Sequence, residues 1–274
     1  MNVCILGSSG LLGSTLHRYI DSQSDMSISE PTRDMVSSVL HDSRLMDTMT
    51  REFDVIVNCV GIVKPKMKDI PRELVYDINV TLPNALANRC YRNNTRLIHI
   101  CSDCVFTGDS APYDENFQPD ATDLYALTKE LHPTNCCTIR TSFIGSHSTR
   151  KYGLLEWVKS KRGESMNGYV NCVWNGVTCL QLSKYIYDII DTNKRWTGVR
   201  HYFSPDSVTK YDLCKSINDI YDLNCDIIPY TADVIEGTEI QGTLDRSLST
   251  IYTDTTLPVM SIHDQIQAQK DWEL

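Results

Sequence analysis

The segment D-L-Y-A-L-T-K-E carries a tyrosine and a lysine, Tyr125 and Lys129, four residues apart. On a helix this spacing puts both side chains on one face. A nearby ammonium group favours the phenolate, so we expect Lys129 to lower the pKa of Tyr125, which could then exchange a proton near neutral pH. Ser102 ends the strand-like run L-I-H-I-C-S, where its hydroxyl could hydrogen-bond a reacting carbonyl. The three residues indicate acid–base chemistry at a ketone or alcohol.

A glycine-rich turn follows the apolar run V-C-I-L near the start of the chain. In a strand-to-helix turn the first glycine permits the sharp turn, the second lets backbone approach a pyrophosphate, and the third lets the helix pack on the strand. The N–H groups at the helix N-terminus then bind the phosphates. The spacing here is G-x-x-G-x-x-G, and it predicts a dinucleotide site. The contacts expected at the turn are Gly7, Ser9, Gly10, Leu11, Leu12 and Gly13.

The choice of dinucleotide depends on the end of the second strand-like run, S-I-S-E-P-T-R-D. Glu30 could hold a ribose 2′-hydroxyl, as an NAD site requires, whereas Arg33 could pair with a 2′-phosphate. Both could equally lie on a solvated loop. We predict NADPH, with NADH as the alternative. Lys129 could also hold the nicotinamide ribose.

Strand-like and helix-like segments alternate through the first half of the chain. This alternation predicts an α/β, Rossmann-type doubly wound parallel sheet over residues 1–150. The expected elements include a helix over about 11–20, one over about 71–92 and a strand over 96–102. Residues 151–274 are expected to form mainly a smaller C-terminal α/β substrate lobe, with some later segments returning to the first domain.

Composition excludes several classes of protein. The net charge of −9 disfavours nucleic acid or an anionic membrane surface as a partner, and no apolar run is long enough to span a bilayer. The eleven cysteines are odd in number, and Met1 leads directly into a strand rather than an export signal, so we expect reduced thiols in a cytoplasmic protein. Cys101-x-x-Cys104 has no second pair to complete a zinc site, so no metal is expected.

Beyond these patterns, the chain resembles the extended short-chain dehydrogenase/reductases, and within them the dTDP-4-dehydrorhamnose reductase group. C-S-D-C-V-F-T-G resembles the group's S-T-D-Y-V-F-x-G, with Ser102 at the catalytic threonine position. N-C-V-G-I-V-K-P resembles the stretch that passes under the cofactor, and I-R-T-S-F-I-G resembles the segment that lines the nicotinamide site. Cys104 departs from the pattern, which has tyrosine there.

The resemblance implies hydride transfer from NADPH to C4 of a nucleotide-linked 4-keto-6-deoxy sugar, while Tyr125 protonates the oxygen. The sugar would be dTDP- or UDP-linked, of rhamnose or acetamido type, and a precursor of surface glycans. It also implies further cofactor contacts and a homodimer. These contacts are Asp42, Cys59, Val60, Gly61, Tyr125 and Lys129. The residues expected to touch the sugar are Ser102, Asp103, Cys104 and Tyr125.

Other functions remain open at this point. A dehydratase of the superfamily needs T-D-E where this chain has S-D-C, which counts against it. An epimerase or a bifunctional epimerase/reductase needs no such pair. A non-catalytic NADP-binding regulator, like the regulatory subunit of methionine adenosyltransferase, is a further alternative. Basic residues that could bind a diphosphate would favour an enzyme, although such a run is commonly a solvated face. They are Lys151, Lys159, Lys161 and Arg162.

Overall fold

The computed structural model describes residues 1–147, 152–235, 238–239 and 242–273. Its internal contacts divide the chain into two units. Unit 1 comprises residues 1–105, 121–140 and 183–200, and unit 2 comprises residues 106–120, 141–182 and 201–274. Lys151, one of the basic residues named above, lies outside the described residues.

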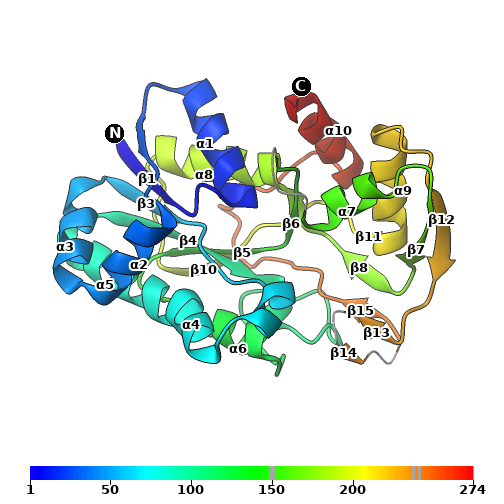
Figure 1. The fold of residues 1–274 in the computed structure, drawn as a ribbon, viewed down its shortest axis with the longest axis horizontal. Helices are drawn as coiled ribbons and strands as arrows, with labels where there is room; N and C mark the ends of the chain where they lie inside the picture. The colour runs from blue at the N-terminus through cyan, green and yellow to red at the C-terminus, as the bar shows by residue number, and fades with distance from the viewer. Residues whose placement is uncertain (148–151, 236–237, 240–241, 274) are drawn as a thin grey trace. The chain divides into compact units, whose positions relative to one another are not determined.

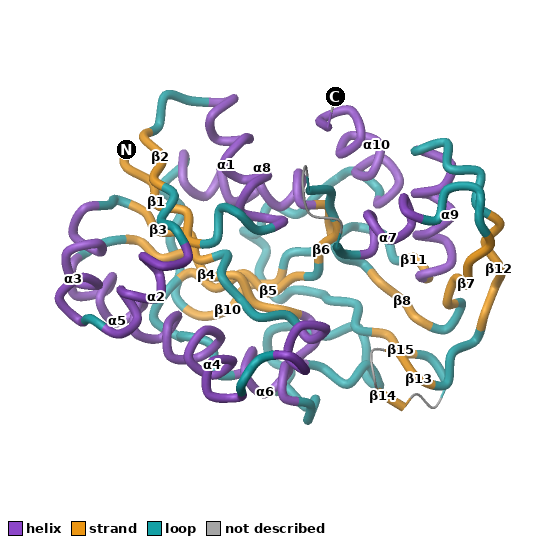
Figure 2. Tube along the Cα trace, viewed as in Figure 1, coloured by secondary structure: helices purple, strands orange, loops and turns teal. Residues whose placement is uncertain are grey.

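Unit 1 is built on a six-stranded sheet in the order β10-β5-β4-β3-β1-β2, whose strands form a twisted layer in Figure 2. β1 pairs in parallel with both β2 and β3, and β3 pairs in parallel with β4. β3 and β4 are buried along their whole length, although β4 carries polar residues at Arg96, His99 and Ser102. The strands are β1 (Asn2–Leu6), β2 (Ser27–Ser29), β3 (Val55–Asn58), β4 (Arg96–Ser102), β5 (Cys137–Thr141) and β10 (Gly198–His201).

Helices cover both faces of this sheet (Figure 1). On one face, α1 and α8 meet through the edge-to-face rings of Tyr19 and Tyr187. On the other face α2, α3 and α5 pack over the strands in a cluster that includes Val39, Met49 and Leu86. The predicted doubly wound α/β fold is therefore confirmed. The helices are α1 (Leu11–Gln23), α2 (Arg33–His41), α3 (Ser43–Glu52), α4 (Arg72–Tyr76), α5 (Leu82–Asn93), α6 (Leu124–Glu130) and α8 (Cys179–Asp191).

The helix expected over about 71–92 forms, but it is interrupted. α4 ends at Tyr76, a π-helical turn η2 (Asp77–Thr81) follows, and α5 begins at Leu82. A π turn inserts extra backbone into a helix and is frequent at functional sites. Here the turn contains Asn79, whose side chain is 2% exposed.

Unit 2 consists of short strands and three helices in the part of the chain that the structure describes. Its core includes Leu155, Ile217 and Ile266, one from each helix. None of the described helices is long and apolar enough to cross a membrane. The elements are β6 (Phe143–Ile144), α7 (Leu154–Ser160), β7 (Ser165–Tyr169), β8 (Cys172–Trp174), β9 (Val177–Thr178), β11 (Val208–Thr209), α9 (Lys210–Ile220), β12 (Asp226–Tyr230), β13 (Val234–Ile235), β14 (Thr238–Glu239), β15 (Leu244–Asp245) and α10 (Ile262–Glu273).

Candidate active site

The turn between β1 and α1 requires glycine at two of its three glycine positions. Gly7 has φ +83°, a left-handed conformation that side chains rarely adopt. A Cβ atom on Gly13 would lie 2.3 Å from the Gly7 carbonyl oxygen, so the helix packs on the turn only without a side chain there. Gly10 closes the turn by donating its N–H to that same oxygen at 2.8 Å.

The N-terminus of α1 is suited to bind phosphate. Gly10 occupies the N-cap position and has no side chain to accept the N–H groups of the first turn, where Leu11 and Leu12 lie. Free helical N–H groups and the helix dipole together attract anions. Ser9 is exposed beside them. The residues therefore fit a dinucleotide pyrophosphate, as the glycine pattern predicts.

The segment after β3 lies against this turn. Cys59 donates its N–H to the carbonyl of Leu6 at 3.0 Å, and a Cβ atom on Gly7 would lie 3.1 Å from the Val60 nitrogen. Within the sheet, β2 lies next to β1 on one side and β3 lies next to β1 on the other, so the strand order reverses at β1. Open α/β sheets bind ligands at such a reversal, outside the carboxyl ends of the strands. The structure thus brings Cys59, Val60 and Gly61 together with the glycine turn.

Two asparagines that the sequence interpretation missed hold this segment. Asn58 accepts the Val60 N–H on Oδ1 at 3.1 Å. Asn79 clamps both backbone groups of Ile62, accepting its N–H at 2.8 Å and donating to its carbonyl at 3.0 Å. The signal that could have found Asn58 is a polar residue at the end of an apolar strand. Asn79 carries no comparable signal, because its side chain is directed toward Ile62 by the π turn, which the sequence does not predict.

The three proposed catalytic side chains come from two elements of unit 1. Ser102 is the last residue of β4 and is 8% exposed. Tyr125 and Lys129 lie on α6, which begins where Asp123 accepts the N–H groups of Tyr125 and Ala126. The phenol of Tyr125 is hydrogen-bonded to Ser102. The Lys129 ammonium is 3.5 Å from the Ile100 carbonyl oxygen. A Cβ atom on Gly61 would lie 3.2 Å from the Lys129 ammonium nitrogen.

The expectation that Lys129 lowers the pKa of Tyr125 is wrong. Burial raises the pKa of Tyr125 well above its ordinary value, Cys104 raises it further, and the hydrogen bond with Ser102 only partly opposes this. The physical reason is that the phenolate would lose its hydration. Burial also lowers the pKa of Lys129. Tyr125 therefore remains protonated at neutral pH, which suits a proton donor.

Asp103 and Cys104 continue from Ser102 in a short 3₁₀ turn, η3 (Asp103–Val105). The Ser102 hydroxyl donates to Asp103 Oδ1 at 3.2 Å and accepts the Cys104 N–H at 3.1 Å. Asp103 is buried, whereas Cys104 is partly exposed. The turn therefore fixes Ser102 Oγ beside Tyr125 and leaves Cys104 as the more accessible side chain.

The residues expected to choose the cofactor lie at the surface. Glu30 follows β2, and its carboxylate is 3.8 Å from His17 Nε2 on α1. Arg33 is the exposed first residue of α2 and makes no hydrogen bond or ion pair with any described residue. Asp42 caps α3 by accepting the N–H groups of Arg44 and Leu45 on one oxygen. Arg33 is thus the cation available near the end of β2.

The basic residues of unit 2 are occupied by neighbours. Lys159 lies 3.0 Å from Glu156 and 3.3 Å from Glu273, and Lys161 lies 2.8 Å from Glu164. Arg162 donates to the backbone carbonyls of Tyr221 and Asp222. Lys159, Lys161 and Arg162 therefore already have partners within unit 2, which makes them weak candidates for diphosphate ligands.

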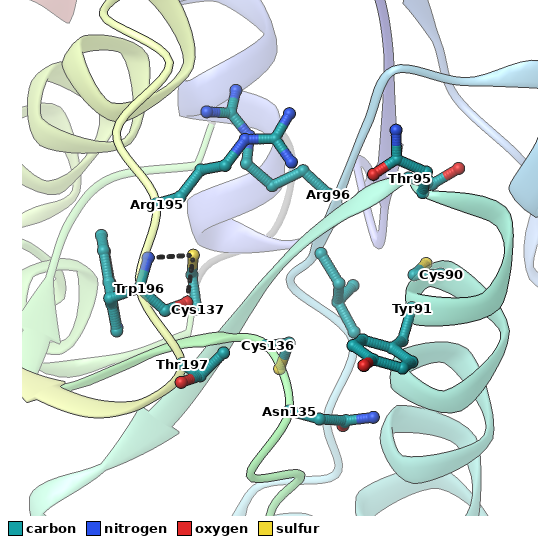
Figure 3. A pocket seen from close by; sticks show the side chains of 12 residues that line it. Cys90, Tyr91, Thr95, Arg96, Asn135, Cys136, Cys137, Arg195, Trp196 and Thr197 are labelled. Carbon is teal, nitrogen blue, oxygen red and sulfur yellow. Dashed lines mark hydrogen bonds between the residues drawn. The ribbon is translucent and has the colours of Figure 1, made fainter.

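A cavity of about 400 Å³ in unit 1, drawn in Figure 3, is lined by none of the three proposed catalytic residues. It is lined by Arg96, Cys137 and Thr197, at the starts of β4, β5 and β10, whereas Ser102 ends β4. The Arg96 guanidinium donates to the carbonyls of Ile189 and Ile190 at the C-terminal end of α8. This arrangement caps a helix and neutralises its negative end. Among the described residues, no group of three or more His, Cys, Asp or Glu could hold a metal ion.

Comparison with known proteins relates most of the chain to a family. The family model described as the RmlD substrate binding domain matches residues 1–233. The chain is 28% identical over 135 residues to the dTDP-4-dehydrorhamnose reductase of Mycobacterium tuberculosis, covering 46% of this chain and 42% of that protein. A 28% match over 135 residues relates it to methionine adenosyltransferase 2 subunit beta of Rattus norvegicus, covering 46% and 40%. The chain thus matches less than half the length of these two relatives.

Other similarities extend over most of the chain. The probable low-salt glycan biosynthesis reductase Agl14 of Haloferax volcanii is 24% identical over 272 residues, covering 90% of this chain and 86% of that protein. The crystal structure of dTDP-4-dehydrorhamnose reductase from Bacillus anthracis in complex with NADP superposes with a TM-score of 0.80 at 17% identity, covering 100% and 99%. The resemblance carried by C-S-D-C-V-F-T-G is confirmed: the chain belongs to the RmlD substrate binding domain family.

Proposed function

We propose that this protein is an NADPH-dependent reductase of a nucleotide-activated 4-keto-6-deoxy sugar, acting in the synthesis of surface glycan precursors. The observation that carries the proposal is the grouping of Ser102, Tyr125 and Lys129 at the carboxyl edge of the sheet, beside the segment after β3 and the glycine turn. Membership of the RmlD family and the NADP complex of the Bacillus anthracis relative support it.

Each side chain has a distinct role in this proposal. Bound NADPH supplies the hydride. When substrate binds, the Ser102 hydroxyl redirects its hydrogen from Asp103 to the substrate carbonyl. Tyr125, kept protonated by burial, delivers the proton to the carbonyl oxygen. The Lys129 ammonium holds the nicotinamide ribose. Asp103 and Cys104 contact the sugar.

The test is NADPH oxidation against a panel of dTDP- and UDP-linked 4-keto-6-deoxy sugars, including acetamido sugars. Turnover with at least one sugar, lost in Tyr125→Phe, is the expected result. The reduced sugars and the remaining 4-keto sugars are then separated by chromatography. Inversion at a carbon next to C4 in either fraction would indicate an epimerase or a bifunctional enzyme.

The second candidate is a non-catalytic NADP-binding regulator, and the match to methionine adenosyltransferase 2 subunit beta favours it. A regulator would bind NADPH and oxidise none in the presence of any sugar of the panel. It would also bind a methionine adenosyltransferase catalytic subunit in a pull-down assay. The homodimer and the cytoplasmic location expected from the sequence stay predictions.

A further inference from the structure

We propose that His99 is a positioning residue for the cofactor site: through Asn58 it fixes the backbone of Cys59, Val60 and Gly61. This inference rests on the cofactor site of the proposed function. His99 is buried, and its ring hydrogen-bonds to Asn58 rather than to any of the proposed catalytic side chains.

The sheet register places the pair side by side. Asn58 of β3 is directly opposite His99 of β4, and Leu6 of β1 is opposite Asn58. Asn58 is 0% exposed and His99 is 1% exposed. The Asn58 amide nitrogen and His99 Nδ1 are 3.2 Å apart. The row therefore runs from the strand that enters the glycine turn to the strand that ends in Ser102.

The hydrogen-bond directions in this pair are determined by chemistry. The Val60 backbone N–H can only donate, so the Asn58 oxygen must face it. The Asn58 NH₂ group must then face His99, and His99 Nδ1 must accept. The ring proton is consequently on Nε2, and a doubly protonated ring would set two donors against each other. Burial, with Lys129 and His132, holds the pKa of His99 well below its ordinary value, consistent with a neutral ring.

Nε2 has no hydrogen-bond partner among the described residues, although it is buried. A buried N–H without an acceptor is costly, so an apolar residue would be the simpler way to fill this space. Polarity at position 99 is explained if its other nitrogen has a task. That task is to orient Asn58, whose side-chain oxygen accepts the Val60 N–H and so fixes the position of that peptide. The next residue, Gly61, lies beside the Lys129 ammonium.

Two substitutions separate positioning from packing. In His99→Asn the amide oxygen is the same number of bonds from the backbone as Nδ1, so it can still accept from Asn58, but the side chain is much smaller. In His99→Leu the volume is better filled and no acceptor remains. If His99 acts only through packing, His99→Leu should bind NADPH more tightly than His99→Asn. If it positions Asn58, His99→Asn should bind NADPH more tightly than His99→Leu.

The experiment measures the NADPH dissociation constant by fluorescence titration, with the thermal midpoint of each variant recorded separately. We expect His99→Asn to bind within about threefold of wild type and His99→Leu to bind about tenfold more weakly, even where Leu is the more thermostable. If His99→Leu does not fold, His99→Gln replaces it, because its amide oxygen lies one bond too far from the backbone.

NADPH binding by His99→Leu, or by His99→Gln in its place, that equals or exceeds binding by His99→Asn would overturn the inference. Rescue of binding in His99→Asn is the outcome that a merely structural role would not produce. Wild type that binds NADPH but reduces no sugar would refute the reductase and leave this test intact. Wild type that binds no NADPH would refute both.

Discussion

Gly13 and Gly7 approach so closely that a Cβ atom on Gly13 would lie 2.3 Å from the Gly7 carbonyl oxygen. The equivalent atom on Gly10 would lie 3.1 Å from the same oxygen, which a shift of a few tenths of an ångström can relieve. Gly13 therefore tolerates a side chain less well than Gly10 does. Gly13 allows α1 to pack on the turn, and we expect Gly10 to leave room for a phosphate in front of the helix N-terminus.

Gly13→Ala is expected to lower the free energy of unfolding by about 1–3 kcal/mol, because the methyl group overpacks the turn. Gly10→Ala should leave the urea unfolding midpoint nearly unchanged and weaken NADPH binding on the order of tenfold. Urea unfolding and calorimetric titration of both variants measure the two effects. Unchanged NADPH affinity in Gly10→Ala would show that the phosphate binds elsewhere.

Tyr125→Phe removes the proton donor and keeps the ring. We expect single-turnover hydride transfer to fall roughly a hundredfold or more, the usual size of a general-acid contribution. NADPH affinity should remain within about twofold of wild type, because phenylalanine keeps the packing of the ring and loses only the hydroxyl. Stopped-flow absorbance measures the transfer step, and Ser102→Ala is the matched comparison, since it removes the other hydroxyl. A Tyr125→Phe enzyme with full turnover would exclude Tyr125 as the acid.

The pH dependence of sugar reduction should be set on its alkaline side by Lys129. Burial lowers the pKa of Lys129 from its ordinary value of about 10.4, whereas burial raises the pKa of Tyr125. As pH rises, Lys129 therefore loses its proton before Tyr125 does, and the rate should fall through that pKa. In Lys129→Arg the cation persists, so any remaining activity should extend to higher pH. An alkaline limb at the same pH in both enzymes would assign it to another group.

Arg33→Ala tests the preference for NADPH. If Arg33 pairs with the 2′-phosphate, its loss should weaken NADPH binding by about 1–3 kcal/mol, as expected for a charge-assisted hydrogen bond. NADH binding should hardly change. Glu30→Gln is the control on the same loop, and it should favour NADPH slightly by removing a negative charge. Equal losses for both cofactors in Arg33→Ala would give Arg33 a structural role instead.

Local patterns in the sequence are sufficient to predict the strand that ends at Ser102, the helix that carries Tyr125 and Lys129, and the glycine turn. Each depends on contacts within a few residues, namely apolar runs, i to i+4 spacing and glycine placement. The π turn around Asn79 is different. The sequence predicts one helix there, and only packing against the segment after β3, where Asn79 binds Ile62, makes the interruption favourable.

By itself, the sequence determined the fold class and the family, because these are expressed in local patterns and short motifs. The tertiary structure decided how the groups behave. It raised the pKa of Tyr125 where proximity to Lys129 predicted a decrease, because burial depends on everything that packs around the ring. It also paired Asn58 with His99, which are 41 residues apart, since register between β3 and β4 is a property of the sheet and not of either strand.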